Sequence, residues 1–336
     1  MKAFLDRKGV KPSFHTYVIQ ALSFMALGLF SSLIIGLIME TIGDLLGLDL
    51  LKSMGDMAMG LYGPAIGVAV AYGLKAPRLV LFAAVISGAA GAELGGPAGS
   101  FIAALLSTEI GKLVSKETKL DIIVTPFITI FVGIGTATLI GPSIDFGLSQ
   151  FGDFLEWATE QQPFIMGIII AIFMGLALTA PISSVAIAFM IGIEGIAAGA
   201  ATVGCAAQMI GFATSSFREN RWSGFVAQGI GTSMLQIGNI MKNPWIILPP
   251  TLTAAILGPI ATVVFLMENN DAGAGMGTSG LVGQIMTIHT MGSSMSVLLS
   301  IALLHFILPA VLSLIFSEWL RKTGKIKAGD MKIEQS

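Results

Sequence analysis

Long runs without charged residues, separated by short polar stretches, make up most of the chain. Apart from histidines, the charge-free runs cover residues 12–39, 57–74, 122–144, 161–193, 195–217, 222–241, 243–267 and 272–317. An α-helix needs about 20 apolar residues to cross a bilayer, and these runs have about that length or more. The pattern predicts an all-α, polytopic membrane protein with about 8–10 transmembrane segments.

A further apolar run, 79–108, is interrupted by a single charged residue, Glu93. Its two halves are short for a bilayer, so they predict either two tilted helices or a re-entrant pair. The stretch 88–99 holds five glycines and a proline. Each glycine costs a helix about 1 kcal/mol relative to alanine, so we expect a broken helix here and a second break at 273–280.

The composition supports the same class. The chain is 54% hydrophobic and 11% charged, with a mean hydropathy of +0.85, whereas a soluble domain carries about 25% charged residues. The 18 basic and 20 acidic residues nearly cancel, which excludes nucleic acid as a partner. One cysteine and three histidines exclude a disulfide framework, and we expect neither a metal nor a cofactor.

The two halves of the chain look alike, which predicts internal repeats. The segment at Pro64 aligns with the segment at Pro181 at an offset of 117 residues, later segments align at 124, and 215–221 is the predicted insertion. Transporters are typically built from such repeats. Within a single membrane domain, 1–336, we expect a first helix (16–39), repeat one (57–142), an interfacial linker helix (143–160), repeat two (164–267), a glycine-rich broken segment (268–293), a last helix (294–317) and a basic cytoplasmic tail (318–336).

The charges between the apolar runs predict the orientation of the chain. The N-terminus and the tail are basic, while residues 145–160 carry four acids and no base. Because basic loops stay on the cytoplasmic side, both termini are expected there, with the two repeats parallel. No small-residue cleavage site follows the first run, so it is expected to be a retained helix in the cell membrane.

Candidate binding residues lie in the broken stretches and in glycine-rich helices. A carboxylate such as Glu93 is costly at membrane depth unless it has a partner or a task; its alternative role is a helix cap at the interface. Neutral donors and acceptors beside glycines suit a hydroxylated or anionic small molecule. The predicted substrate-binding set, at the interface of the repeats, is Glu93, Gly95, Gly96, Gln208, Asn239, Gly275, Gly277, Thr278, Ser279, Gln284 and His289.

Simpler roles stand beside these predictions. Gln208 and Asn239 could form interhelical hydrogen bonds, and 273–280 could be a purely structural turn. Gly275, Gly277 and Gly280 match a dinucleotide-binding pattern, but no strand precedes them, so we discard that interpretation. No nucleophile–base pair or metal set can be assembled, so no catalytic residue is predicted.

Five motifs are similar to those of a known family: Gly95-Gly-Pro-Ala-Gly99, Asp121-Ile-Ile-Val-Thr-Pro126, Gly204-Cys-Ala-Ala-Gln208, Ser216-Phe-Arg-Glu-Asn220 and Gly273-Ala-Gly-Met-Gly-Thr-Ser-Gly280. With them, nearly the whole chain resembles the bacterial phosphotransferase-system enzyme II C subunits, some of which are called perfringolysin regulators. The resemblance implies a sugar permease that works with separate phosphocarrier subunits, A and B. Phosphotransferase activity would need those subunits.

The resulting hypothesis is a membrane permease that carries or binds a sugar or another small polar solute, and we expect it to be a homodimer. Two alternatives remain open. The first is a proton- or cation-coupled transporter or channel that uses Glu93. The second is a membrane regulator that senses a ligand without moving it.

Overall fold

The computed structural model describes residues 2–333, which contain 83% helix and no β-strand. The chain divides into two compact units, Met1–Gly147 and Leu148–Ser336. Among the described residues, six helical segments are long and apolar enough to cross a membrane, and a seventh span is possible if α4 (Asp49–Gly60) and α5 (Tyr62–Gly73), bent by 52°, count as one. The predicted all-helical membrane fold is confirmed. Counting by length gives fewer spans than the charge-free runs suggested, because several of those runs fold as shorter pieces.

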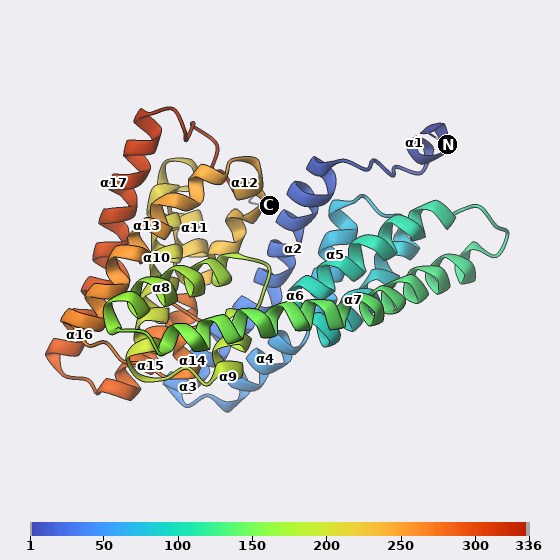
Figure 1. The fold of residues 1–336 in the computed structure, drawn as a ribbon. Helices are drawn as coiled ribbons and strands as arrows, with labels where there is room; N and C mark the ends of the chain where they lie inside the picture. The colour runs from blue at the N-terminus through green and yellow to red at the C-terminus, as the bar shows by residue number, and fades with distance from the viewer. Residues whose placement is uncertain (1, 334–336) are drawn as a thin grey trace. The chain divides into compact units, whose positions relative to one another are not determined.

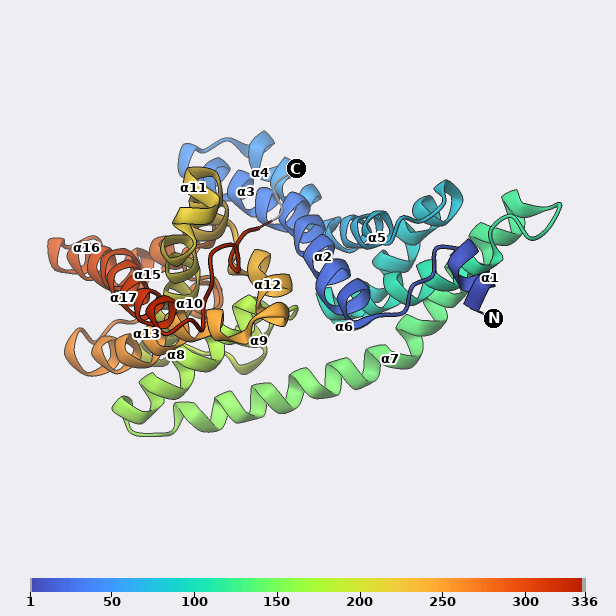
Figure 2. The same ribbon diagram turned by 90° about the horizontal axis from the view of Figure 1, so that it is seen from above.

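Unit 1 consists of helices that follow one another in chain order (Figures 1 and 2). They are α1 (Lys2–Arg7), the continuous helix formed by η1 (His15–Gln20), α2 (Ala21–Leu29), η2 (Phe30–Ile34) and α3 (Ile35–Leu46), then α4 (Asp49–Gly60), α5 (Tyr62–Gly73), α6 (Arg78–Val114) and the first part of α7 (Asp121–Thr159). The predicted linker helix, 143–160, is not a separate element here: its residues extend α7 to Thr159.

Although α6 is 37 residues long, it is a helical hairpin. Its backbone leaves the helical region at Gly95 and Gly96, where Gly96 has φ 58° and ψ −151°. Beyond this point the chain turns back: a Cβ on Gly91 would meet the carbonyl of Gly99, and a Cβ on Gly111 would meet the side chain of Val80. The predicted break within 88–99 is confirmed, and it takes the re-entrant form.

Unit 2 is built around α10 (Gly195–Ser215), which is almost completely buried. The helices α8 (Pro163–Thr179), α13 (Leu248–Pro259) and α17 (Leu308–Lys322) pack against it. The approach is close because a Cβ on Gly204 of α10 would meet the carbonyl of Ala171 in α8. Small residues that let helix backbones touch are the usual basis of packing between membrane helices.

The remaining elements of unit 2 are short. They are α9 (Ser184–Ile191), α11 (Phe217–Val226), η3 (Ala227–Gly231), η4 (Ser233–Gln236), α12 (Ile237–Lys242), η5 (Pro244–Ile247), η6 (Ile260–Val264), α14 (Asp271–Ala274), η7 (Ser279–Leu281), α15 (Val282–Met291), α16 (Met295–Ile301) and η8 (Ala302–Ile307). Positive φ angles at Gly277, Gly280 and Leu281 interrupt the chain between α14 and α15. The second predicted break is therefore also confirmed.

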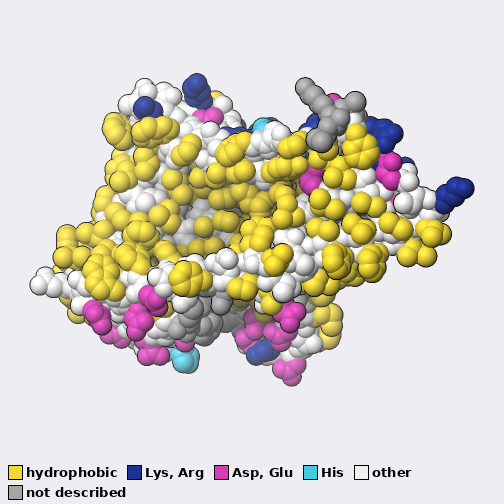
Figure 3. Space-filling model, turned by 45° about the vertical axis from the view of Figure 1, so that its right-hand side comes forward, with side chains coloured by type: hydrophobic (Ala, Val, Ile, Leu, Met, Phe, Trp, Pro, Cys, Tyr) yellow, Lys and Arg dark blue, Asp and Glu magenta, His cyan; other side chains and the backbone are white. Residues whose placement is uncertain are grey.

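The surface of each unit matches a protein embedded in a bilayer. On the face drawn in Figure 3, hydrophobic side chains cover much of the surface, and the Lys, Arg, Asp and Glu side chains lie mostly at its margins. Large apolar side chains such as Leu139, Phe131 and Ile122 are more than half exposed. An apolar surface of this extent is stable only against lipid or another apolar partner.

Candidate functional site

Buried polar side chains of unit 2 gather around one interrupted stretch, Ala227–Gln236, which we call the broken segment. It runs as a π-helix to Gly231, becomes extended at Thr232 (φ −156°, ψ 141°), and continues as a 3₁₀ turn to Gln236. The hydroxyl of Thr232 accepts a hydrogen bond from the backbone N–H of Met234. The interruption frees the carbonyls of Gly229 and Gly231 from regular helical bonding, so that they can accept other donors.

The glycine segment, Gly273–Gly280, lies directly against the broken segment. The hydroxyl of Thr278 donates to the carbonyl of Gly229 over 2.5 Å, and that of Ser279 donates to the carbonyl of Gly231 over 2.8 Å. Gly277 packs against the backbone of α10, where a Cβ would meet Cys205 and Ala206. Thr278 and Ser279, both predicted site residues, thus lie at the interrupted stretch, and Gly275 and Gly277 carry the backbone past α9 and α10.

Gln208, another predicted residue, belongs to a chain of neutral polar groups that we call the hydroxyl cluster. Its Nε2 donates to the hydroxyl of Thr251 over 2.9 Å. Its Oε1 lies 3.5 Å from the hydroxyl of Thr179, which also lies 2.8 Å from the hydroxyl of Ser233. Because Ser233 belongs to the broken segment, the hydroxyl cluster also contacts that segment.

Asn239 lies in a third group, the amide cluster, formed by Ser216, Gln228, Gln236 and Asn239, together with Asn220, which shares the Met331 carbonyl as an acceptor with Gln236. Gln228 donates to the hydroxyl of Ser216, Gln236 donates to Gln228, and Asn239 donates to Gln236, at 2.8–2.9 Å. All five side chains are buried. Gln228 and Gln236 are themselves part of the broken segment, which therefore contacts all three polar groups.

Two further residues that the sequence reasoning did not select hold this region together. Asn269 is 1% exposed, and its Nδ2 lies within 3.1 Å of the hydroxyls of Thr202 and Thr287 and of the carbonyl of Gly283. His305 is also buried, and its Nδ1 lies 2.9 Å from Nε2 of Gln284. The sequence could have indicated Asn269 as a site residue, because it lies just before the glycine segment. No feature of the neighbouring sequence indicated His305.

His289 and Glu93 do not lie where the sequence reasoning expected them. His289 is exposed in the last turn of α15, apart from the buried pair of Gln284 and His305. In unit 1, Glu93 is exposed at the end of the first arm of α6 and takes part in none of the ion pairs formed between described residues. The re-entrant turn at Gly95 and Gly96 follows Glu93 and places it at the tip of a hairpin, so its role as a binding residue stays a prediction.

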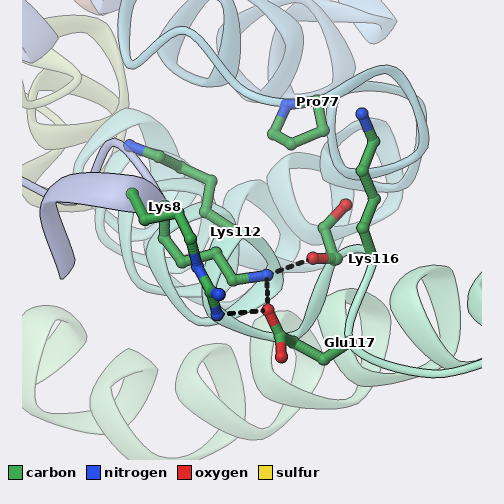
Figure 4. Close-up of a pocket in the computed structure, with 7 residues that line it drawn as sticks. Lys8, Pro77, Lys112, Lys116 and Glu117 are labelled. Atoms are coloured by element: carbon green, nitrogen blue, oxygen red, sulfur yellow. Dashed lines mark hydrogen bonds and ion pairs between the residues drawn. The ribbon is translucent and has the colours of Figure 1, made fainter. Parts of the chain in front are cut away.

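A cavity of about 350 Å³ in unit 1 is lined by Arg7, Lys8, Pro77, Lys112, Ser115, Lys116 and Glu117 (Figure 4). Three of its four cations are already paired: Arg7 and Lys8 both reach Glu117, at 2.9 and 2.5 Å, and Lys112 reaches Glu109 at 2.9 Å. The hydrogen bond from Lys8 holds the pKa of Glu117 below its usual value. These contacts fasten the N-terminal segment to the end of α6.

The polar groups around the broken segment carry no formal charge, and no three His, Cys, Asp or Glu side chains among the described residues are grouped as metal ligands. A search of curated proteins finds no match to the chain. In a scan of protein families, the model described as "Phosphotransferase system, EIIC" matches residues 19–333. Since this match covers almost the whole chain, the protein belongs to the phosphotransferase-system EIIC family, the membrane sugar-transport components of that system.

Proposed function

We propose that this chain binds an uncharged sugar within unit 2, at the broken segment Ala227–Gln236, and passes it across the membrane as the permease subunit of a phosphotransferase system. The observation that carries the proposal is the meeting of three buried, uncharged polar groups at one interrupted stretch of backbone. Such interruptions are typical of solute sites in transporters, because they expose backbone dipoles at membrane depth.

The chemistry of these groups favours a neutral, hydroxylated solute. Amides and hydroxyls both donate and accept hydrogen bonds, which matches the hydroxyl groups of a sugar. A charged solute would be expected to meet an opposite charge, because an unpaired ion is costly in a buried site. In the conformation described, the donors and acceptors bond one another, as Gln208 does with Thr251. A sugar would replace these internal bonds with its own.

The partners follow from the family. We propose that cytoplasmic A and B components supply the phosphoryl group, that the chain forms a homodimer, and that both termini face the cytoplasm. Within this proposal the Glu93 side chain is not a ligand for the sugar, because it is exposed at the hairpin tip. Ion coupling through Glu93 and ligand sensing without flux become distinguishable outcomes of the experiment below.

The test is thermal unfolding of the purified protein in detergent with a panel of unphosphorylated hexoses, pentoses, hexitols and disaccharides, and with their phosphates as charged counterparts. A neutral sugar should raise the unfolding temperature, and its phosphate should not. Gln208→Leu, which removes the bonds to Thr251 and Thr179, should weaken binding of that sugar about tenfold, as for the loss of one buried hydrogen bond.

Gln161→Leu is the matched control, because Gln161 lies outside the three polar groups and donates only to a neighbouring backbone carbonyl. It should bind the sugar as the unmodified protein does. Stabilisation by phosphates or cations alone would contradict the proposal, and a flux in vesicles that follows a proton gradient and disappears in Glu93→Gln would favour the ion-coupled alternative. Binding of the sugar without flux, even with phosphocarriers present, would favour the regulator.

A further inference from the structure

The end of the chain, Lys325–Ile333, which we call the tail segment, is held in the amide cluster as a bound peptide would be. Asn220 and Gln236 both donate to the carbonyl of Met331, at 2.8 and 2.9 Å, and Asn239 donates to the carbonyl of Lys332 at 2.9 Å. The backbone N–H of Ile333 donates to Oδ1 of Asn220 at 3.0 Å. The side-chain amides therefore recognise the main chain of the tail.

Apolar side chains complete this contact. Ile326, Met331 and Ile333 are 2%, 0% and 6% exposed, whereas Lys332, between the last two, is exposed. Met331 and Ile326 pack in a core with Phe212, Ile240 and Ile246 of unit 2. In the ribbon views, the red segment after α17 runs back towards α12 (Figures 1 and 2). Hydrogen bonds to the main chain, combined with buried apolar side chains, are how a peptide segment is held on a protein surface.

We infer that the tail segment is a removable plug of the solute site, whose docking and sugar binding exclude each other; this inference rests on the proposed function. Gln228 and Gln236 belong to the broken segment, and the tail occupies the bonding capacity of Gln236, Asn239 and Asn220. While the tail is seated, those amides are closed to a sugar. When the tail leaves, they form an open, uncharged polar recess.

Detachment of the tail segment should require less free energy than unfolding of unit 2. The described tail has no helix beyond Lys322 and contains only short-range backbone bonds, such as those from Asp330 to Lys327 and from Lys332 to Gly329. Its anchors are side-chain hydrogen bonds, three apolar residues and Lys325, whose Nζ lies 4.5 Å from the centroid of the Trp245 ring, while the helices beneath retain their own bonding. Segments of this kind open locally at a lower free energy than the core.

The experiment uses the full chain with Met331→Asp and Ile333→Asp, which remove the apolar anchors and unseat the tail. A fluorescent peptide with the sequence of residues 325–336 is titrated by anisotropy against this variant and against the unmodified protein. We expect saturable binding to the variant and at least tenfold weaker binding to the unmodified protein, whose recess is filled by its own tail. A peptide carrying the same two substitutions is the control and should not bind.

A second measurement keeps the test valid if that variant does not fold. Cys205 is the only cysteine, so Cys205→Ala with Ile326→Cys gives a single buried reporter in the tail. We expect slow maleimide labelling that accelerates when the unlabelled peptide is added, because the peptide captures the recess each time the tail leaves. Labelling that the peptide does not change would show a permanently docked tail and overturn the inference.

The sugar found in the thermal-unfolding screen supplies the final arm. It should displace the peptide from the unseated variant and accelerate labelling of the reporter. Peptide and sugar binding together without competition would overturn the plug while leaving the proposed function intact. Peptide that binds neither protein, or both equally, would overturn it as well. If no sugar binds any form of the protein, the proposed function is contradicted, and so is the mutual exclusion of sugar and tail. Peptide binding still decides whether the tail docks reversibly.

Discussion

At the scale of single residues, the protein buries amide and hydroxyl side chains in a largely apolar interior. Asn269 shows why this is stable: the same side chain bonds two hydroxyls and one carbonyl, and its Oδ1 accepts from the backbone N–H of Asn270. Buried polar groups are tolerated when they are bonded in this way. The identity of such residues was readable from the sequence, but their partners came from distant parts of the chain.

Asn269→Leu should therefore destabilise the protein by about 1–3 kcal/mol, because the buried hydroxyl oxygens of Thr202 and Thr287 lose the amide donor from which they accept. The unfolding temperature in detergent measures this effect. Gln162→Leu, at an exposed position before α8, serves as the control and should change little. An Asn269→Leu protein as stable as the unmodified one would show that Thr202 and Thr287 find other partners.

Backbone strain at Arg221 makes a second residue-scale prediction. Its φ and ψ, 53° and −155°, are close to those of Gly96, 58° and −151°, a region that favours glycine. Arg221→Gly should stabilise the protein by about 1 kcal/mol, and Gly96→Ala should destabilise it by about 1–3 kcal/mol. Arg221→Ala is the control: it removes the same exposed side chain but keeps the strain, so its unfolding temperature should not rise.

At the scale of elements, glycine sets how closely helices approach and where they break. Gly204 and Gly175 bring α10 and α8 into backbone contact, whereas Gly95 and Gly96 turn α6 back on itself. The helix breaks were expected from the clusters of glycine at 88–99 and 273–280. Which glycine serves which purpose depends on the neighbour that each one meets, and the sequence does not show that neighbour.

Two glycine-to-alanine substitutions should consequently have opposite effects. Gly204→Ala places a methyl group against the carbonyl of Ala171 and should cost about 1–3 kcal/mol through overpacking. Gly135→Ala, in α7 with nothing near the added methyl, should stabilise the helix by up to about 1 kcal/mol. Thermal unfolding of both variants tests this, and equal effects would contradict the close contact between α8 and α10.

The N-terminal segment provides a pH prediction. The hydrogen bond from Lys8, with the charges of Lys8 and Arg7, lowers the pKa of Glu117, so the contact stabilises the docked segment above the usual carboxylate pKa of 4.5 and is lost as the pH falls through the lowered value. Hydrogen exchange of residues 4–11 should be slow at pH 7 and should accelerate, after correction for intrinsic rates, well below pH 4.5. Glu117→Gln should show the fast exchange already at pH 7.

At the scale of the whole molecule, the charge pattern still predicts the topology. The N-terminus and the basic tail are expected in the cytoplasm, and the acidic stretch before α8 outside. Fusions of green fluorescent protein to either terminus should fluoresce, while alkaline phosphatase inserted near residue 161 should be active. A phosphatase that is active at a terminus would reverse the predicted orientation and would place the tail segment on the outer side.

The predicted internal repeats are not supported by a shared backbone feature. Gly96 and Arg221 have similar unusual φ and ψ angles, but Arg221 belongs to the predicted insertion and therefore has no counterpart in repeat one. The predicted insertion, 215–221, lies at the end of α10 and in the first residues of α11. The repeats stay a prediction, and superposition of 61–142 on 178–266 is its test.

The sequence by itself determined the class of protein, the family and the positions of both helix breaks. Bilayer thickness sets the length of the apolar runs and glycine weakens a helix locally, so both effects can be read from short stretches of sequence. It also singled out Gln208, Thr278 and Ser279. Only the tertiary structure decided that these residues meet at the broken segment, that Glu93 lies exposed at a hairpin tip, and that the tail segment fills the amide cluster. The reason is physical: helix packing brings together hydrogen-bond partners that lie more than a hundred residues apart, such as Asn220 and Met331, and a local sequence pattern does not show that packing.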